Sequence, residues 1–347
     1  MDWNILYTIY MSDLISKVSR EFNKLLIKKM NSFDTGKKFF RFLAKPYIAG
    51  TNIEEGIKTI QEFKDKKGAV STFDILGEEA TTLKKANQYM KAYKDIIDLL
   101  YKKFPDSDVA SISLKLTSIC AVDAKDKTKL LTGDLFNTRL EEIVVYAKNK
   151  GIKVTLDMED HNWTDRSLKS AEYIWKNGHD NFGIVLQSRL NRTRQDIKSF
   201  LDVYYPVPRE KRRVRACIGI YDEPAEIATT SKKEAKKRLT EMIRELFGIG
   251  IYVEIATHDY NVINEIIKFI KENKIDSSRF EFQFLKGVEK GHKIAQHLIE
   301  IGYKVRFYMP CELVKGDGTP YMERRLIANP TIGWYGLKNT FQRMLKY

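Results

Sequence analysis

The sequence predicts an α/β fold in which eight β/α units close into a TIM-type (β/α)8 barrel, preceded by an N-terminal helical arm. From about residue 69, short apolar runs alternate with amphipathic segments of about ten or more residues, a pattern typical of parallel β/α units. The runs number eight, which is the number that closes a barrel. No G-x-G-x-x-G stretch follows the first run, which disfavours an open doubly wound sheet with a dinucleotide site.

The 347-residue length suits one barrel with additional helices. We expect residues 1–65 to form the N-terminal helical arm, because apolar residues such as Leu14, Val18 and Phe22 recur there at a spacing of three to four. Residues 66–347 are expected to form the barrel, which would carry the functional site.

The expected strands and helices alternate along the whole barrel. The strands are predicted at 69–76, 111–116, 153–158, 182–187, 213–220, 252–257, 280–285 and 304–309. The helices are predicted at 79–104, 137–150, 166–177, 194–204, 232–247, 260–273, 288–301 and 320–329. The last helix has strong start signals, with Thr319 as its cap and Pro320 at its first position.

The composition supplies a sizeable core, with 43% hydrophobic residues and only 8 prolines, and excludes a disordered chain. The formal charge of +14 would suit a nucleic acid or an anionic membrane as partner. The charge is diffuse, however, and the Lys-rich stretch 231–238 opens with the S-x-x-E spacing of a capping box, typical of a solvated helix face. Because the sequence lacks zinc-finger spacings and RNA-binding aromatic motifs, no nucleic acid is expected.

The cysteines indicate a reducing compartment. Cys120, Cys217 and Cys311 are too few and too scattered for a disulfide framework, so we expect a cytoplasmic protein. The N-terminus lacks the basic start and apolar centre of a signal peptide, and no run of about 18 apolar residues follows. Any membrane contact is therefore expected to be peripheral, at the inner face and helped by the basic charge.

Polar residues interrupt the ends of all eight predicted strands, where barrel enzymes carry their reactive groups. A single buried polar group can simply satisfy hydrogen bonds in the core. The occurrence of such groups on every strand is better explained by a common site. The candidates are Asp74, Lys115, Asp157, Gln187, Arg215 with Tyr221, Thr257 with His258, Gln283, and Tyr308.

Several of these residues admit more than one interpretation. Asp157, Glu159 and His161 could be read as a metal cluster, but His161 lies past the end of its strand and no second His-x-His run follows, so no metal is expected. His258 could be a general base or a hydrogen-bonded residue at a strand end. The pair Arg324 and Arg325 could be solvated surface or a clamp for a carboxylate, which the planar guanidinium suits.

Taken in order, short motifs resemble the proline dehydrogenase family across nearly the whole barrel. Each motif is short, but ten of them occur in the right order and most lie at predicted strand ends. The matching stretches are 49–50, 74–78, 113–116, 156–159, 186–187, 213–215 with Gly219 and Tyr221, 256–258, 281–285, 305–310 and 321–326.

The resemblance implies a distorted barrel that binds FAD on its carboxyl face, with the last helix over the substrate. It implies that L-proline is oxidised to 1-pyrroline-5-carboxylate by hydride transfer from the ring carbon beside the nitrogen to flavin N5, with the electrons passed on to a quinone. The flavin supplies the difficult chemistry, and protein groups orient and tune it. A separate pyrroline-5-carboxylate dehydrogenase is expected downstream, because this chain is too short to contain one.

The resemblance also implies roles for individual residues. Arg324 and Arg325 would bind the substrate carboxylate with help from Lys115, because an anion in a closed site needs fixed positive partners. Asp157 would pair with this cationic cluster and hold its geometry. The substrate ring would pack on Tyr308 and Leu285, with Tyr221 as another wall, and the flavin would contact Gln187, Arg215, Gly219, Thr257, His258 and Gln283. Arg215 would stabilise the reduced, anionic flavin.

Three positions depart from the family pattern. Ile218 replaces a lysine, Ile220 replaces a small residue, and Ala328 replaces the acidic residue that usually follows the paired arginines. These changes leave open a related cyclic or secondary amine acid as substrate, or a non-catalytic, ligand-binding barrel of the same family. The retained Tyr308 favours unsubstituted proline over hydroxyproline, by resemblance. A metal-dependent hydrolase built on Asp157 and His161 is a third alternative.

Overall fold

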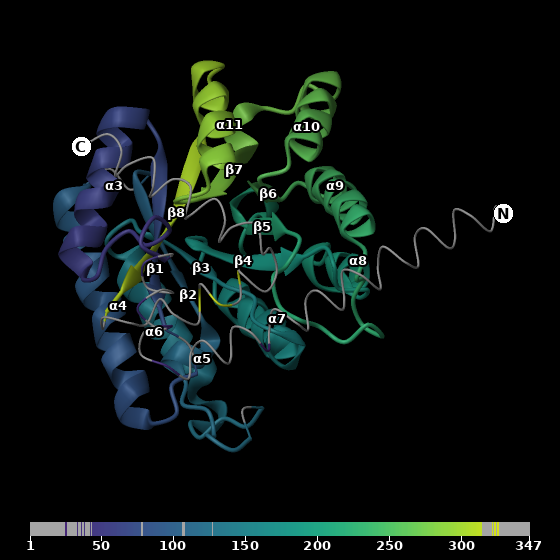
Figure 1. The fold of residues 1–347 in the computed structure, drawn as a ribbon. Coiled ribbons are helices and arrows are strands. Elements are labelled where there is room, and N and C mark those ends of the chain that lie inside the picture. Colours follow the sequence, from purple (N-terminus) through teal and green to yellow (C-terminus); the bar gives the residue numbers. More distant parts are fainter. Residues whose placement is uncertain are drawn as a thin grey trace.

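Eight parallel strands form a closed barrel in which each strand pairs with its neighbours in the chain and β8 pairs back with β1 (Figure 1). The structure is a computed structural model. It describes residues 44–77, 79–105, 108–126 and 128–313, together with positions 25, 33, 36, 38, 42, 321, 323 and 325. The helices surround the strands (Figure 1). The predicted (β/α)8 class is therefore confirmed.

The strands follow the predicted apolar runs, and those predicted at 182–187 and 280–285 are observed without change. Most strand residues are buried on both faces of the barrel wall. The observed strands are β1 (Val70–Leu76), β2 (Ala110–Leu114), β3 (Lys153–Leu156), β4 (Phe182–Gln187), β5 (Arg213–Cys217), β6 (Tyr252–Ala256), β7 (Phe280–Leu285) and β8 (Val305–Glu312).

The ends of β2 and β5 were predicted too far along the chain. After β2 the chain turns into the short helix α5 (Leu116–Ile119), and the Ser118 hydroxyl holds this turn by donating to the Lys115 carbonyl at 2.7 Å. After β5, Gly219 adopts a φ of 99°, a conformation that favours glycine. The strand therefore cannot continue to Ile220.

Strand β8 is longer than predicted. It continues to Glu312 because its last residues pair with β1, where Leu76 lies opposite Glu312. The Glu312 amide also donates to the Gly50 carbonyl at 3.0 Å. The residues that precede α3 (Ile53–Lys67) are thus joined to the end of the last strand, although the two segments are far apart in the sequence.

Of the eight predicted helices, six are observed in order as regular helices within the described residues, and one more helix lies in the predicted arm. They are α3 (Ile53–Lys67), α4 (Leu83–Lys103), α6 (Phe136–Lys148), α7 (His161–Lys176), α9 (Lys232–Gly248), α10 (Tyr260–Glu272) and α11 (Glu289–Glu300). Side-chain caps explain several starts, since the Thr82, Asp160 and Asp259 side chains each accept a hydrogen bond from a backbone amide of the first turn. Of the helix predicted at 320–329, positions 321, 323 and 325 are helical, and Thr319, Pro320 and Ala328 lie outside the described residues.

Helix α3 packs against both β1 and β8 and covers the junction that closes the barrel. The rings of Phe63 and Phe307 meet edge to face, with their centroids 4.9 Å apart. At Gly56, an added Cβ would lie 2.7 Å from the Phe73 ring, so this approach depends on the missing side chain. The last helix of the predicted arm is therefore part of the barrel wall, and the predicted boundary at residue 65 stays a prediction.

The connection from β4 to β5 differs from the regular helix predicted at 194–204. A single α-helical turn, α8 (Thr193–Asp196), is followed by the π-helical turn η2 (Ile197–Leu201). The wider turn directs Phe200 onto Trp175, with a ring-centroid distance of 5.6 Å. An aromatic cluster thus fills the space that the rest of the helix would have covered.

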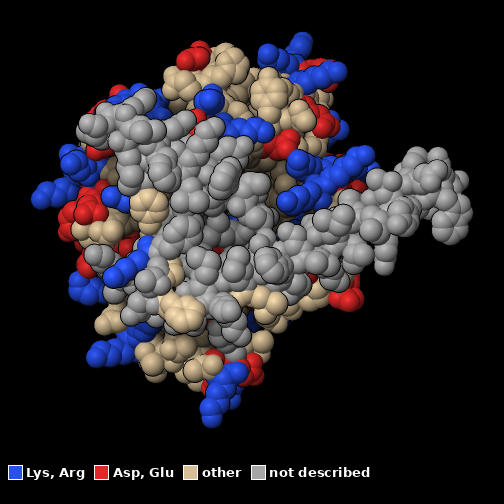
Figure 2. Space-filling view, in the orientation of Figure 1, with Lys and Arg blue, Asp and Glu red and all other residues tan. Residues whose placement is uncertain are grey.

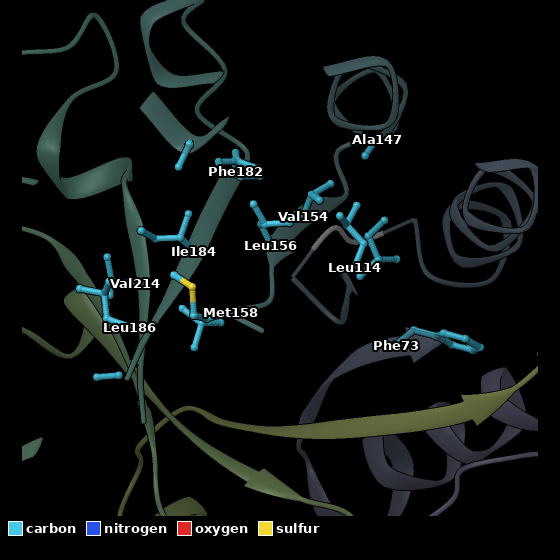
Figure 3. Close-up of a cluster of buried hydrophobic side chains, with 14 of the residues drawn as sticks. Phe73, Leu114, Ala147, Val154, Leu156, Met158, Phe182, Ile184, Leu186 and Val214 are labelled. Atoms are coloured by element: carbon cyan, nitrogen blue, oxygen red, sulfur yellow. The ribbon is translucent and has the colours of Figure 1, made fainter. Parts of the chain in front are cut away.

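Alternate strand residues face opposite sides of the barrel wall. Outward-facing apolar residues such as Leu114, Val154 and Leu156 fill the space between the strands and helix α6, which contributes Ala147 (Figure 3). The inward-facing residues are largely polar or charged and nevertheless buried, as Arg213 and Arg215 of β5 illustrate. The apolar core therefore lies outside the strands, and the inside of the barrel is free to carry chemistry.

The Lys-rich stretch forms the first part of α9, as predicted. The Ser231 hydroxyl accepts a hydrogen bond from the Glu234 amide at 3.3 Å, whereas the Glu234 carboxylate pairs with Arg238 at 2.9 Å. On the face shown in Figure 2, basic and acidic side chains both occur around the described surface. Within the described part of the chain, no helix has the length and apolarity needed to cross a membrane.

Candidate active site

A cavity of about 220 Å³ opens at the carboxyl ends of the strands. This is the end at which barrel enzymes carry their reactive groups. Every strand, or the turn that directly follows it, contributes to the lining. The lining residues are Asp74, Lys115, Asp157, Met158, Val185, Gln187, Arg215, Cys217, Gly219, Ile220, Tyr221, Ala256, His258, Gln283, Phe284, Leu285, Tyr308, Tyr321 and Arg325.

Most of the predicted site residues meet in this cavity. Those that line it are Lys115, Asp157, Tyr221, Leu285, Tyr308, Arg325, Gln187, Arg215, Gly219, His258 and Gln283. Thr257 does not line it, and its hydroxyl accepts a hydrogen bond from the Asp259 amide at 3.2 Å in the turn before α10. Arg324 lies outside the described residues.

Asp157, just after β3, is the centre of the polar network in the cavity. One carboxylate oxygen accepts hydrogen bonds from Ser113 and Arg215, each at 2.6 Å, and the other accepts from the Tyr308 hydroxyl at 2.5 Å. Burial opposes ionisation, but the Arg215 and Lys115 charges hold the pKa of Asp157 below its usual value. Asp157 is therefore a permanent anion that fixes the groups around it.

Lys115, directly after β2, lies between two carboxylates. Its Nζ is 2.8 Å from Asp74 Oδ1 and 3.7 Å from Asp157 Oδ2. Burial opposes the charge of Lys115, but Asp74 and the other nearby acidic groups raise its pKa well above the usual value. The ammonium group is thus fixed and charged at the cavity wall, as an anion-binding group must be.

Arg215 of β5 is held from both sides. Its NH1 donates to Asp157, and its Nε donates to Gln283 Oε1 at 2.7 Å. Gln283 is itself oriented by two carboxylates, because its amide nitrogen donates to Glu254 at 2.8 Å and to Glu281 at 2.7 Å. The predicted cofactor contact Gln283 therefore uses its polar atoms inside the barrel, where it positions Arg215.

His258, after β6, is a neutral imidazole with a defined tautomer. Burial, followed by the nearby Arg325 charge, lowers its pKa to about 3. Its Nε2 accepts a hydrogen bond from the Leu285 amide at 3.3 Å, so the proton resides on Nδ1. Among the described residues, this Nδ1 has no acceptor. The prediction left open a general base, but a neutral hydrogen-bond donor fits the structure better.

Gln187 and Gly219 form a close approach between the ends of β4 and β5. The Gln187 amide nitrogen donates to the Glu159 carbonyl at 2.9 Å, and its Oε1 has no donor within the described residues. An added Cβ at Gly219 would lie 2.1 Å from that oxygen. Glycine is therefore required here to leave the amide oxygen in place at the cavity.

Arg325 reaches the cavity from the last described helical positions. Its guanidinium lies over the Tyr321 ring, with 4.1 Å from Cζ to the ring centroid. Its buried Nε has no hydrogen-bond acceptor in the described part of the chain. Of the two interpretations of the arginine pair, the structure supports a cavity group for Arg325 and not a solvated surface residue.

The three residues considered as a metal cluster point to different partners. Asp157 binds Arg215, the Glu159 carboxylate accepts from Thr117 at 2.6 Å, and His161 Nδ1 lies 2.7 Å from Glu223. Across the described residues, no group of three or more His, Cys, Asp or Glu side chains is placed to hold a metal ion.

The lining residues missed from the sequence are mostly apolar. Val185, Cys217 and Ala256 lie two residues from Gln187, Arg215 and Glu254 respectively, so the two-residue alternation of a strand would have placed them on the same inner face. Met158 and Phe284 gave no sequence signal of this kind. Asp74 was recognised as a strand-end residue, but no role followed from its position.

Comparison with known proteins agrees with this geometry. The family described as Proline dehydrogenase matches residues 56–215 and 225–332. The chain is 30% identical over 321 residues to Proline dehydrogenase 1 of Bacillus subtilis strain 168, covering 92% of this chain and 96% of that one. It is 29% identical over 289 residues to the proline dehydrogenase of Deinococcus radiodurans, covering 83% and 86%.

A solved structure shares the fold. Proline utilization A (PutA) from Bdellovibrio bacteriovorus, inactivated by N-propargylglycine, superposes with a TM-score of 0.73 at 23% identity. The match covers 83% of this chain and 32% of that much longer chain.

Proposed function

This chain belongs to the proline dehydrogenase family, and we propose that it oxidises L-proline to 1-pyrroline-5-carboxylate with FAD as the acceptor of the hydride. The observation that carries the proposal is the set of fixed cations around one cavity, with Lys115, Arg215 and Arg325 all in its wall. An amino acid brings a carboxylate that such cations bind, and an amine that must be oriented for oxidation.

The cavity wall suits both the carboxylate and the pyrrolidine ring of the substrate. We propose that Arg325, with Arg324 and Lys115, binds the carboxylate, since guanidinium groups bind carboxylates in a planar, bidentate way. The pyrrolidine ring would pack between Leu285, Tyr308 and the wall formed by Tyr221. Tyr308 is held in place by its hydrogen bond to Asp157. The chain thus binds the ring, fixes its orientation and excludes water from it.

The cavity also fits a flavin. Its buried polar atoms without a partner among the described residues include Arg215 NH2, His258 Nδ1 and Gln187 Oε1. The first two are donors and the third is an acceptor, which complements the alternating acceptors and donor on the pyrimidine edge of isoalloxazine. FAD would supply a two-electron acceptor at its N5. The cationic Arg215 would stabilise a reduced, anionic flavin.

The remaining parts of the reaction follow from the same proposal. Electrons would pass to a quinone, with peripheral contact at the inner face of the membrane, and a separate enzyme would oxidise the pyrroline-5-carboxylate. Ile220 lines the cavity beside Tyr221. Its bulk favours the unsubstituted ring of proline over larger cyclic amine acids.

The proposal is tested by anaerobic titration of the holoprotein with L-proline, followed at the absorbance band of the flavin. We expect the band to bleach in proportion to the proline added and 1-pyrroline-5-carboxylate to appear in equal amount. A protein that takes up no FAD, or whose flavin is left oxidised by proline, contradicts the proposal.

A variant tests the carboxylate clamp. Arg325→Lys is expected to raise the KM for proline by about 10- to 100-fold with a smaller change in kcat, because lysine keeps the charge but loses the planar pair of donors. The matched control is Arg244→Lys on the outer surface, where Arg244 bridges Glu265 at 2.9 Å and the kinetics should not change. Equal KM values for the two variants would show that Arg325 does not bind the substrate.

A further inference from the structure

The two carboxylates beside Lys115 differ in how well their charges are stabilised. Asp157 accepts hydrogen bonds from Ser113, Arg215 and Tyr308 in addition to the contact with Lys115. Asp74 is 1% exposed, and its Oδ1 accepts from Lys115 at 2.8 Å. Its Oδ2 is buried and has no hydrogen-bond partner within the described residues. Of these two carboxylates, Asp74 is therefore the one that is protonated more readily.

The titration behaviour agrees with this difference in partners. Burial raises the pKa of Asp74 to about 6, although the Lys115 charge opposes the shift. Lys115 itself has a pKa far above neutral. At neutral pH the pair can therefore take up one more proton, and the group that receives it is Asp74.

The other groups around Asp74 do not compete for that proton. Burial raises the pKa of Tyr93 on α4, of Tyr308 on β8 and of Cys311 on β8, the last to about 12, so all three stay protonated. Asp157 stays ionised, because its pKa lies below the usual value. Among the described groups that interact with Asp74, only Asp74 exchanges its proton near neutral pH.

We propose that Asp74, acting through Lys115, takes up the proton that the substrate amine releases during oxidation. The inference rests on the proposed function. Proline carries a secondary ammonium group, which must lose one N–H proton before the neighbouring carbon can give up a hydride. The N–H bond breaks as Lys115 accepts that proton and passes one of its own to Asp74 Oδ1. The freed lone pair of the nitrogen then forms the C=N bond as the C–H bond breaks, and the hydride would go to the flavin. Lys115 begins and ends as an ammonium group, and Asp74 ends as a carboxylic acid.

The geometry supports Lys115 as the group that transfers the proton from the substrate amine to Asp74. Its Nζ lies 2.8 Å from Asp74 Oδ1, within hydrogen-bond distance, and its side chain lines the cavity. The amine and the carboxylate of an α-amino acid are attached to the same carbon. An ammonium group that helps to bind the carboxylate therefore also lies near the amine.

The experiment measures the rate of flavin reduction by L-proline in a single anaerobic turnover of the holoprotein, between about pH 5 and 8. In the wild type, the rate is expected to rise through about pH 6, since Asp74 must be ionised to accept a proton. A rate independent of pH in this range overturns the proposal, whether or not any variant folds. A wild type whose flavin proline does not reduce at any pH refutes instead the proposed function on which the proposal rests.

Two variants separate proton uptake from positioning. Asp74→Asn keeps an oxygen that accepts from Lys115 but cannot take up a proton, and it is expected to slow flavin reduction by about 100-fold and to abolish the rise through pH 6. Asp74→Glu is expected to restore the rise. Cyclopentanecarboxylate, which has the carboxylate but no amine, should bind Asp74→Asn almost as well as the wild type.

Two results obtained with the Asp74→Asn variant would overturn the proposal. If Asp74→Asn keeps the rise through pH 6, the titrating group is another residue. If its affinity for cyclopentanecarboxylate falls as much as its rate, Asp74 only orients Lys115.

Discussion

The barrel interior contains two layers of buried charge that use the same residue types in different ways. The deep layer lies toward the amino ends of the strands and comprises Arg213, Glu254, Glu281 and Arg306, while Gln283 lies between the two layers and also lines the cavity. The cavity layer lies above it at the carboxyl ends and comprises Asp74, Lys115, Asp157, Arg215 and Tyr308. Across the two layers, the cations Lys115, Arg213, Arg215 and Arg306 accompany the carboxylates Asp74, Asp157, Glu254 and Glu281.

In the deep layer, every carboxylate oxygen accepts at least one hydrogen bond. Arg306 binds both oxygens of Glu281, at 2.5 and 3.1 Å. Arg213 binds one oxygen of Glu254 at 2.6 Å, and Gln283 binds the other at 2.8 Å. Although burial opposes ionisation, the Arg306 charge keeps the pKa of Glu281 at about 2. The carboxylates of this layer are therefore fully paired, although Arg213 Nε is buried without a hydrogen-bond partner among the described residues.

In the cavity layer, the pairing is incomplete. Asp74 Oδ2 and Arg215 NH2 are buried without a hydrogen-bond partner among the described residues. A buried polar group without a partner costs stability, and such groups persist where a ligand or a reaction uses them. Buried charge alone therefore does not identify a functional site. Incomplete pairing beside a cavity does.

The largest expected effect is the loss of stability on breaking the deep layer. Arg306→Met leaves the Glu281 carboxylate buried without its cation, and the free energy of unfolding should fall by about 3–5 kcal/mol. Urea unfolding of the holoprotein measures it. Arg244→Met removes an ion pair of similar length on the outer surface, and its cost should be about 1 kcal/mol or less. Similar losses in the two variants would mean that the deep layer is not a structural network.

The second prediction makes the same substitution in each layer. Tyr308→Phe removes the donor to Asp157 at 2.5 Å, and Tyr252→Phe removes a donor to Glu281 at 3.3 Å. We expect Tyr308→Phe to lower kcat/KM for proline by about 10-fold, which corresponds to about 1.4 kcal/mol. Tyr252→Phe should leave kcat/KM unchanged, because Glu281 keeps its bonds to Arg306 and Gln283. Equal kinetic effects would show that the two layers are coupled.

The smallest expected effect concerns the access of water to the cavity, which His258 lines. His258 has a pKa lowered to about 3, first by burial and then by Arg325, so its ring signals in NMR should not shift between about pH 5 and 8. The nitrogen shifts should correspond to a proton on Nδ1. A His258 that titrates near the usual value of about 6.5 would show that water enters this layer freely.

The barrel and the location of its site could be predicted from the amino-acid sequence alone. Buried strands read as apolar runs, and a polar residue at the end of such a run must face the carboxyl side of the barrel. Asp157, Arg215 and Tyr308 were identified in this way, although they are far apart along the chain. The two-residue alternation also places Arg213 below Arg215 and Glu281 below Gln283, on the same inner face.

Which of these polar groups pair with one another became clear only from the three-dimensional arrangement of the strands. The cofactor contact of Gln283 stays a prediction, and the structure adds that its amide is oriented by Glu254 and Glu281 and holds Arg215. The same role of Thr257 also stays a prediction, and the structure adds that its hydroxyl accepts a hydrogen bond in the turn before α10. Asp74 received no role from the sequence. The physical reason is that hydrogen bonds across a barrel depend on the stagger of the strands and on side-chain rotamers, and neither is encoded in the spacing along one strand.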